Sequence, residues 1–236
     1  VASYNSNALW LRSPAEIAAE ALELIAEGDF KALKFRMGRE RLSDDLATAQ
    51  ALRDTLDDNI ELMVDFNQGM DMAEALSRCH AIDDLDLVWI EEPIIYNDFG
   101  GYAKLASELK TPLQIGENFY GVQDMYKALD AKACDLVMPD FMRIGGVTGW
   151  LQAAGLAAAA NIPMSTHLYP EVAAHVMRVT RTAHLLEWQD WAEAVLAEPY
   201  QVVKIQLRGL KNNDQPYDNA GIEQTMYLLT LQLTLG

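Results

Sequence analysis

Three acidic residues at equal intervals constrain what this chain can fold into. Asp65, Glu91 and Glu117 are spaced 26 residues apart, and each comes at the end of a short, largely apolar run. A strand, a turn, a helix and a return loop occupy about that length of chain. In a parallel α/β barrel, such positions lie at the C-terminal mouth, where catalytic groups gather. The spacing therefore predicts that these three carboxylates meet at one mouth.

Carboxylate oxygens at such a mouth suit a hard divalent cation. Mg²⁺ is usually held by a few carboxylates together with water and substrate oxygens. The competing interpretation is that acids simply flank strands as solvated loop residues. It accounts for any one of the three, but not for three with one period and one register. We therefore expect Asp65, Glu91 and Glu117 to bind Mg²⁺ as cofactor.

The rest of the chain repeats the same alternation of strand and helix. Apolar segments that read as strands occupy residues 1–6, 32–37, 61–66, 87–91, 113–116, 136–139, 163–166 and 183–186, with helical patterns between them. Eight strands alternating with helices predict an α/β fold with a closed parallel barrel rather than an open sheet. We expect residues 1–199 to form this TIM-like barrel. Residues 200–236 carry no clear period and are expected to be a C-terminal extension of uncertain structure.

The charge and the cysteines limit the possible partners. The formal net charge of −17 argues against nucleic acid and against an anionic membrane surface. An anionic substrate would need a local cationic site. The two cysteines provide no disulfide framework and fit a reducing cytoplasm. With no apolar run of membrane-spanning length and no signal-peptide pattern, we expect a cytoplasmic protein that acts on a small molecule.

Basic and imidazole side chains also follow the predicted strands. Lys34 and Arg36 lie two apart on one strand and therefore share a face. A buried lysine can bind a carboxylate or move a proton, whereas arginine stays charged; alternatively, both pair with the acids. Asp140 and His167 follow neighbouring strands, so the carboxylate can bond one imidazole nitrogen and raise the basicity of the other. Glu187 ends the last strand and can form a hydrogen bond across the mouth, or it is an exposed loop acid.

Two amides complete the set of candidates. Asn67 and Asn118 lie just beyond two of the acids, where an amide can bind substrate hydroxyls. The chain has no glycine-rich loop of the dinucleotide or Walker type and no cysteine spacing typical of zinc.

Several of these motifs occur together, in order, in one known family. They are Lys34-Phe35-Arg36, Val64-Asp65-Phe66-Asn67, Trp89-Ile90-Glu91-Glu92-Pro93, Gly116-Glu117-Asn118, Pro139-Asp140 with Gly145-Gly146-Val147-Thr148-Gly149, Ser165-Thr166-His167 and Leu186-Glu187. Over residues 1 to about 199, the chain resembles the barrel domain of the enolase superfamily, specifically its mandelate racemase subgroup. That resemblance implies a (β/α)8 or modified (β/α)7β barrel, and a homo-oligomer.

The resemblance also implies roles for the site residues. The three acids would bind Mg²⁺, and the metal would hold a substrate carboxylate. His167, paired with Asp140, would take the proton α to that carboxylate, and the metal would stabilise the resulting enediolate. Lys34 and Glu187 would give further electrophilic help. A preorganised cationic site is needed because such a proton is very weakly acidic.

The sequence departs from the family pattern in two ways. The racemases of the family have a second lysine where this chain has Arg36, and arginine is a poor base. One-base chemistry is therefore favoured, and we expect an acid-sugar dehydratase, a carbon–oxygen lyase, in which Arg36 contacts the substrate. A racemase or epimerase of an α-hydroxy acid is the alternative, and a non-catalytic metal-binding barrel fragment is another. The second departure is that we expect the N-terminal capping domain of the family to be absent from this chain.

Overall fold

The computed structural model describes residues 1–191 of the chain, so the predicted extension at residues 200–236 lies outside the described residues. Seven parallel strands form one sheet in the order β6-β5-β4-β3-β2-β1-β7. The strands are β1 (Ala2–Asn5), β2 (Ala32–Arg36), β3 (Glu61–Asp65), β4 (Leu87–Glu91), β5 (Leu113–Ile115), β6 (Leu136–Val137) and β7 (Leu185–Trp188).

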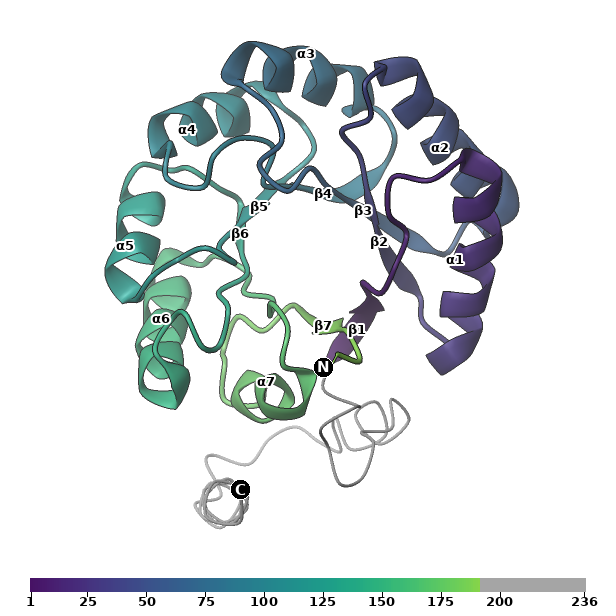
Figure 1. The fold of residues 1–236 in the computed structure, drawn as a ribbon. Helices are drawn as coiled ribbons and strands as arrows, with labels where there is room; N and C mark the ends of the chain where they lie inside the picture. The colour runs from purple at the N-terminus through teal and green to yellow at the C-terminus, as the bar shows by residue number, and fades with distance from the viewer. Residues whose placement is uncertain (192–236) are drawn as a thin grey trace.

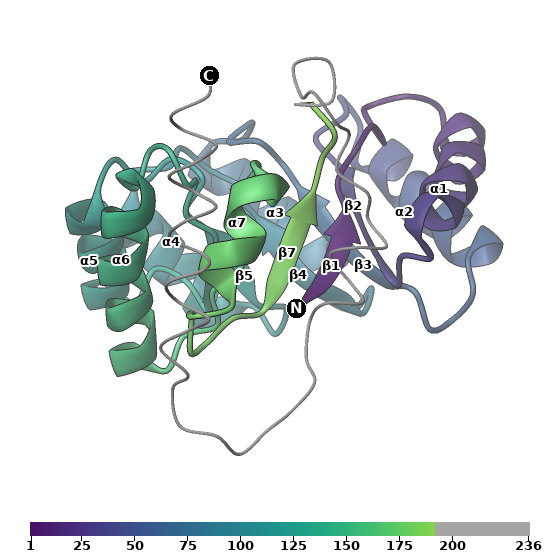
Figure 2. The same ribbon diagram turned by 90° about the horizontal axis from the view of Figure 1, so that it is seen from below.

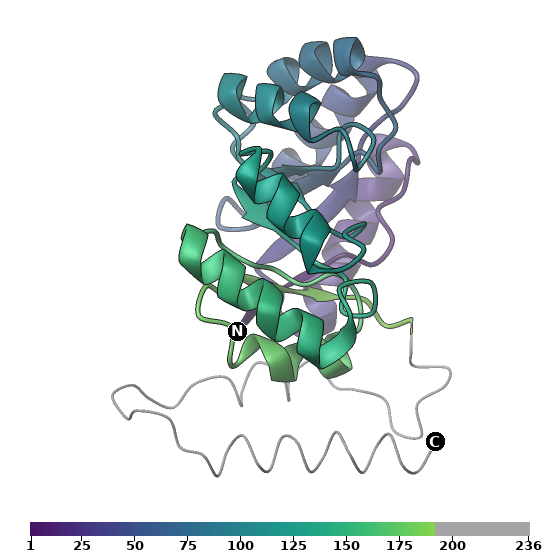
Figure 3. The same ribbon diagram turned by 90° about the vertical axis from the view of Figure 1, so that its left-hand side faces the viewer.

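Helices surround this ring of strands, as Figure 1 shows. They are α1 (Pro14–Gly28), α2 (Leu42–Thr55), α3 (Met72–Ile82), α4 (Phe99–Glu108), α5 (Val122–Asp130), α6 (Gly146–Ala160) and α7 (Pro170–Met177). Figure 2 shows β1 beside β7 with α7 outside them, and Figure 3 shows α5 and α6 side by side on the outer layer. The predicted parallel α/β barrel is confirmed.

The ring closes between β6 and β7 through a segment that is not a regular strand. Met164 forms isolated parallel bridges with Val137 on one side and Ala183 on the other. A full strand was predicted over residues 163–166. In this segment a side-chain hydroxyl takes the place of a backbone carbonyl as acceptor: the Glu187 amide N–H donates to Thr166 Oγ1 at 2.8 Å. The predicted eighth strand is β7, which begins two residues later than expected and contains Glu187.

Local sequence signals explain where the helices begin. Ser13 caps α1, with its hydroxyl accepting from the Glu16 amide and the Glu16 carboxylate accepting from the Ser13 amide. This reciprocal pair satisfies two amide donors that a helix start leaves free. Pro14 occupies the first turn, where its missing N–H costs nothing. Asp71 caps α3 with its side chain, which accepts from the Glu74 amide.

The core has two layers. The larger one lies between strands and helices, and a smaller one fills the barrel interior. The interior cluster consists of Tyr4, Ala32, Met63, Trp89, Leu136 and Leu185. Successive strand residues point to opposite faces, so each strand feeds both layers. Both cysteines are free and buried. No helix within residues 1–191 combines the length and hydrophobicity needed to cross a bilayer.

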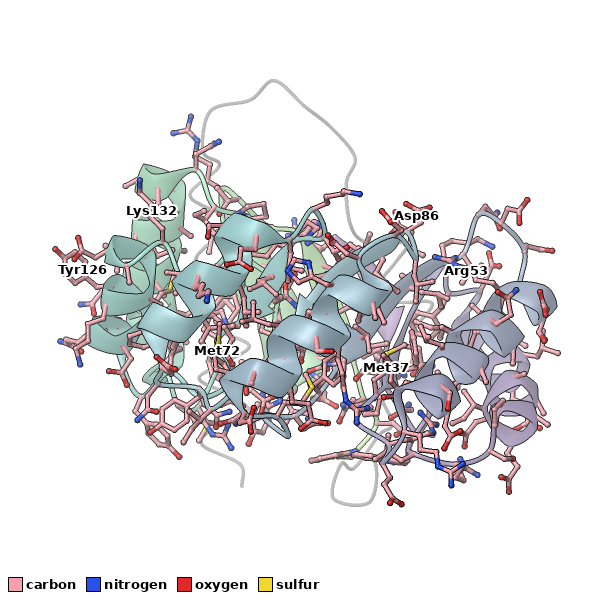
Figure 4. The ribbon with its side chains drawn as sticks, turned by 90° about the horizontal axis from the view of Figure 1, so that it is seen from above. Met37, Arg53, Met72, Asp86, Tyr126 and Lys132 are labelled. Atoms are coloured by element: carbon pink, nitrogen blue, oxygen red, sulfur yellow. The ribbon has the colours of Figure 1, made fainter. Side chains whose placement is uncertain are left out.

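The two ends of the barrel carry different loops. Asp86 and Lys132, which precede β4 and β6, lie toward one end in Figure 4, whereas Met37 and Met72, which follow β2 and β3, lie toward the other. The end where strands terminate holds the predicted site residues, as in other barrels of this architecture.

Candidate active site

The three predicted acids meet at the mouth of the barrel. Asp65 and Glu91 end β3 and β4 and are register partners, and Glu117 follows β5. One oxygen from each carboxylate lies within 4.8 Å of the others. Asp65 and Glu91 are buried, and Glu117 is partly buried. Hard oxygen donors gathered in this way fit a divalent cation such as Mg²⁺.

A glycine lets the chain turn so that Glu117 can join this group. Gly116 has a φ of +138°, a conformation that L side chains rarely adopt. A Cβ added there would lie 2.9 Å from Phe119 Cε2 and 3.0 Å from the Met138 amide nitrogen. The turn after β5 therefore requires glycine.

Lys34 lies among the acids as a buried cation. Its Nζ is 2.5 Å from Glu91 Oε1, 3.0 Å from Glu187 Oε1 and 3.5 Å from Asp65 Oδ2. Burial alone would lower the pKa of Lys34, but the carboxylates of Glu187 and Glu91 outweigh it and raise that pKa. Lys34 is therefore an ammonium ion here, which suits binding of an anion better than taking up a proton.

Hydrogen bonds hold all three acids in place. Asp65 accepts from the Asn67 amide N–H at 2.8 Å and from Asn67 Nδ2 at 3.0 Å. Glu91 Oε2 accepts from the Trp89 indole at 2.9 Å. Asn118 Nδ2 donates to Glu117 Oε1 at 3.2 Å. The two predicted substrate-binding amides thus contact the acids in this structure, and their contact with a substrate stays a prediction.

The predicted imidazole–carboxylate pair is present beside the acid group. His167 Nδ1 donates to Asp140 Oδ2 at 2.8 Å, and Nε2 lies 3.3 Å from Glu117 Oε2. The amides of Met142 and Arg143 donate to the other Asp140 oxygen. Burial alone would lower the pKa of His167, but the bond to Asp140 and nearby carboxylates outweigh it and raise that pKa. The ring orientation directs Nε2 toward the acids.

Glu187 connects the imidazole side to the lysine side. Its Oε2 accepts from the Leu168 amide N–H at 2.7 Å, and its Oε1 faces Lys34. Burial would raise the pKa of Glu187, but the charge of Lys34, with smaller contributions from His167 and the Leu168 amide, lowers it to about 2. Glu187 is fully buried and is not the exposed loop acid of the competing interpretation.

Arg36, by contrast, is bound by the loop after β1. Its Nη1 donates to the carbonyls of Ser6 at 3.1 Å and Ala8 at 3.3 Å, and its guanidinium lies 4.8 Å from the centroid of the Trp10 ring. Within residues 1–191, no carboxylate lies at ion-pair distance from Arg36. Its Nε is buried without a hydrogen-bond partner in the described part of the chain. Contact between Arg36 and a substrate stays a prediction.

Two residues at the site were not singled out from the sequence. Trp89 precedes Glu91 by two positions on β4, and this spacing places both on one strand face. Glu92 is 1% exposed, and its Oε2 accepts from Asn118 Nδ2 at 2.9 Å. Burial and the charges of Glu117 and Asp65 raise the pKa of Glu92 to about 8. Its position directly after Glu91 was the available signal.

The fold and these side chains define an α/β-barrel domain whose acidic mouth has a donor set that fits a divalent cation. A family model described as "Enolase C-terminal domain-like" matches residues 16–210. The chain belongs to the enolase superfamily, within the subgroup of mandelate racemase and muconate lactonizing enzyme.

Relatives and solved structures agree with this assignment. The chain is 28% identical over 202 residues to L-talarate/galactarate dehydratase of Salmonella typhimurium, which covers 86% of this chain and 51% of that protein. The crystal structure of an enolase from alpha pretobacterium bal199 with bound magnesium is 66% identical, with a TM-score of 0.83, and the match covers 85% of this chain and 56% of that one. L-Talarate dehydratase from Polaromonas sp. JS666, complexed with magnesium and L-glucarate, is 31% identical with a TM-score of 0.80, covering 84% and 55%.

The relatives of this chain within the superfamily carry out several different reactions. Curated relatives at about this level of identity include dehydratases, a racemase, an epimerase and cycloisomerases. Solved relatives hold magnesium, and some hold carboxylate ligands such as glucarate or mandelic acid. The chain spans about half the length of the curated relatives it matches.

Proposed function

We propose that the protein is a Mg²⁺-dependent acid-sugar dehydratase in which Asp65, Glu91 and Glu117 hold the metal. The observation that carries this proposal is the orientation of His167, whose Nδ1 is bonded to Asp140 while Nε2 faces the acid group. Mg²⁺ bound there would supply a Lewis acid that binds the substrate carboxylate and neutralises charge developing on it.

His167 performs the proton transfers. Its Nε2 takes the proton from the carbon α to the carboxylate, and the hydrogen bond from Nδ1 to Asp140 stabilises the imidazolium that forms. The imidazolium then returns the proton to the β-hydroxyl, which leaves as water. The enol that remains becomes a 2-keto acid. One base on one face of the α-carbon is enough for this sequence.

Lys34 and Glu187 contribute charged groups to the mouth of the barrel. Lys34 is a fixed cation at the floor, where it can attract a carboxylate oxygen of the substrate. Glu187 holds the Lys34 ammonium through an ion pair, and it holds the backbone after His167 by accepting a hydrogen bond from the Leu168 amide. Preorganised groups of this kind stabilise developing charge without reorganising during the reaction.

The environment of Arg36 favours dehydration over racemisation. Racemisation with two bases needs a proton acceptor on each face of the α-carbon, and a guanidinium stays protonated. Arg36 also donates to two backbone carbonyls. We propose that it contacts the substrate, if at all, as a cation rather than as a base.

Incubation with a panel of aldonates and aldarates in D₂O, with Mg²⁺ present, tests the reaction. Keto-acid product from one of them supports dehydration. Inversion at the α-carbon with deuterium uptake and no keto acid would instead establish a racemase or epimerase. Mg²⁺ binding without either reaction on any acid would favour the non-catalytic barrel.

His167→Asn tests the assigned base. We expect it to reduce turnover by at least about 100-fold, the lower range for general-base catalysis, while Mg²⁺ still binds because the three acids remain. His80→Asn is the control, since the His80 side chain is 48% exposed on α3 and its ring pairs with Glu108, away from the candidate site. Equal activity of both variants would remove His167 from the mechanism. We also propose that the protein is a homo-oligomer, as the family resemblance implies. Light scattering tests this: a mass that is a multiple of 26.3 kDa supports it, and the mass of one chain contradicts it.

A further inference from the structure

The carboxylate of Glu91 has its two oxygens assigned to different partners. Oε1 lies 2.5 Å from Lys34 Nζ, and Oε2 accepts from Trp89 Nε1 at 2.9 Å. Glu91 is 0% exposed, so no bulk water competes for either oxygen. A buried carboxylate needs such donors, because loss of hydration without replacement is costly.

The indole partner comes from the same strand. Trp89 and Glu91 are two apart on β4, so both side chains point into the barrel. Trp89 lies two residues nearer the start of the strand than Glu91 and belongs to the interior cluster beneath the mouth. An indole N–H can donate a hydrogen bond but cannot accept one, so Trp89 can contact the Glu91 carboxylate only as a donor.

The ring of Trp89 is itself held in place. Tyr4 of β1 packs edge-on against it, with ring centroids 5.3 Å apart and planes at 83°. The Tyr4 ring also lies beneath Lys34, whose Nζ is 5.7 Å from the ring centroid. These two aromatic rings therefore form a rigid floor that touches both Glu91 and the lysine paired with it.

We propose that Trp89 is a positioning residue of the metal site: its indole N–H holds Oε2 of Glu91 and so fixes the orientation of this carboxylate beside Asp65 and Glu117. This inference rests on the proposed Mg²⁺ site, and it adds a residue that acts through a ligand rather than on the substrate. Without the indole bond, the Glu91 carboxylate can rotate, so that part of its population is no longer arranged to bind the ion.

Mg²⁺ titration of the 236-residue chain by calorimetry, with no substrate present, tests this role. Trp89→Phe removes the N–H but keeps an aromatic ring against Tyr4. We expect its Mg²⁺ dissociation constant to rise by about 10-fold, since loss of a partner that orients a metal ligand typically costs roughly 10- to 100-fold in affinity. An unchanged dissociation constant would overturn the proposal.

Trp150→Phe is the matched control. Trp150 on α6 is also 0% exposed, and its indole donates to Thr180 Oγ1 at 2.9 Å, away from the mouth. Both substitutions remove the same atoms and one hydrogen bond of the same length. We expect only the Trp89 variant to lose Mg²⁺ affinity. An equal loss in the two variants would show a general effect on the fold and would overturn the positioning role.

A second replacement at position 89 separates the loss of the N–H donor from the smaller side-chain volume of phenylalanine. Benzothienylalanine at position 89 has sulfur in place of the indole N–H and nearly the same shape, so it keeps the packing and lacks the donor. A dissociation constant raised as in Trp89→Phe supports the proposal, and one equal to that of the unmodified protein overturns it. Failure of the unmodified protein to bind Mg²⁺ would overturn the proposed metal site and this inference together. Absence of dehydratase activity alone would overturn the function and leave the metal-binding result standing.

Discussion

At the scale of single residues, the site is a balance of buried charges. Asp65, Glu91 and Glu187 surround the ammonium of Lys34, and all four side chains are almost completely buried. A buried charge left without its partner is strongly destabilising, whereas a complete buried set is close to neutral. Lys34 therefore stabilises the mouth when no metal is bound, apart from any role with a substrate.

Replacement of Lys34 tests this balance. We expect Lys34→Met to lower the free energy of unfolding in EDTA by roughly 3–5 kcal/mol, because the acids lose their cation. Mg²⁺ should then stabilise the variant more than it stabilises the unmodified protein, since the ion relieves the same repulsion. Chemical denaturation with and without Mg²⁺ measures both effects.

Lys31→Met is the control for this prediction. Lys31 pairs with Asp29 at 2.6 Å, but the two side chains are 59% and 83% exposed. Such a surface pair contributes little, so we expect a change within about 0.5 kcal/mol. A loss in Lys34→Met no larger than that of the control would contradict the assigned role of Lys34.

At the scale of elements, strand ends were the most predictable part of the molecule. Strands of a parallel barrel are buried on both faces and read as apolar runs, so an acid that ends a run marks the mouth. Asp65, Glu91 and Glu117 could be brought together from spacing alone. The bonds of Arg36 could not, because they depend on how the distant loop after β1 folds back over β2.

Two other features could not be predicted from the apolar runs of the sequence and their spacing. The segment at residues 163–166 has the composition of a strand, but the hydroxyls of Ser165 and Thr166 accept ladder hydrogen bonds in place of carbonyls. Trp89 was grouped with the apolar run, although the spacing of two from Glu91 already placed both on one face. In each case a side-chain polar atom, rather than hydrophobicity, decides the local structure.

A junction between elements also depends on one carboxylate. Asp83, at the end of α3, accepts from the amides of Lys110 at 3.0 Å and Thr111 at 2.7 Å, and so ties α3 to the entrance of β5. Burial alone would raise the pKa of Asp83, but these hydrogen bonds outweigh it and lower that pKa. The charged form is therefore favoured by folding.

We expect Asp83→Ala to lower the free energy of unfolding at pH 7 by about 1 kcal/mol. Because the pKa is lower in the folded state, this stabilisation is complete above the unfolded pKa of about 3.9 and is lost as the pH falls through the folded value. The difference between the variant and the unmodified protein should therefore shrink in acid. Denaturation at several pH values measures it.

The neighbouring residue provides the comparison for Asp83. Asp84 pairs with Lys110 Nζ at 2.7 Å, but its side chain is 86% exposed. Asp84→Ala should change stability by less than about 0.5 kcal/mol at any pH. A pH-independent loss in Asp83→Ala would mean that lost packing, rather than the carboxylate, is responsible.

At the scale of the whole molecule, the ring of strands joins the metal site to global stability. The acids and Lys34 come from β2, β3, β4 and the turn after β5, and Glu187 lies on β7, at the other end of the sheet order from β6. Such a site exists only when distant parts of the chain are assembled. An ion that binds there therefore binds the folded state and raises its stability.

Mg²⁺ should consequently raise the melting temperature, and EDTA should reverse the change. At a Mg²⁺ concentration 100 times the dissociation constant, the gain in the free energy of unfolding is about 2.7 kcal/mol, which for a domain of this size corresponds to roughly 5–10 °C in melting temperature.

The net charge of −17 calls for a salt control, because any salt screens self-repulsion within the protein. NaCl at equal ionic strength separates the two effects, since it screens charge but cannot replace Mg²⁺ among three carboxylates. Glu117→Gln, which removes one ligand, should lose most of the Mg²⁺-specific shift while responding to NaCl like the unmodified protein. Equal shifts with the two salts would show that screening alone stabilises the fold.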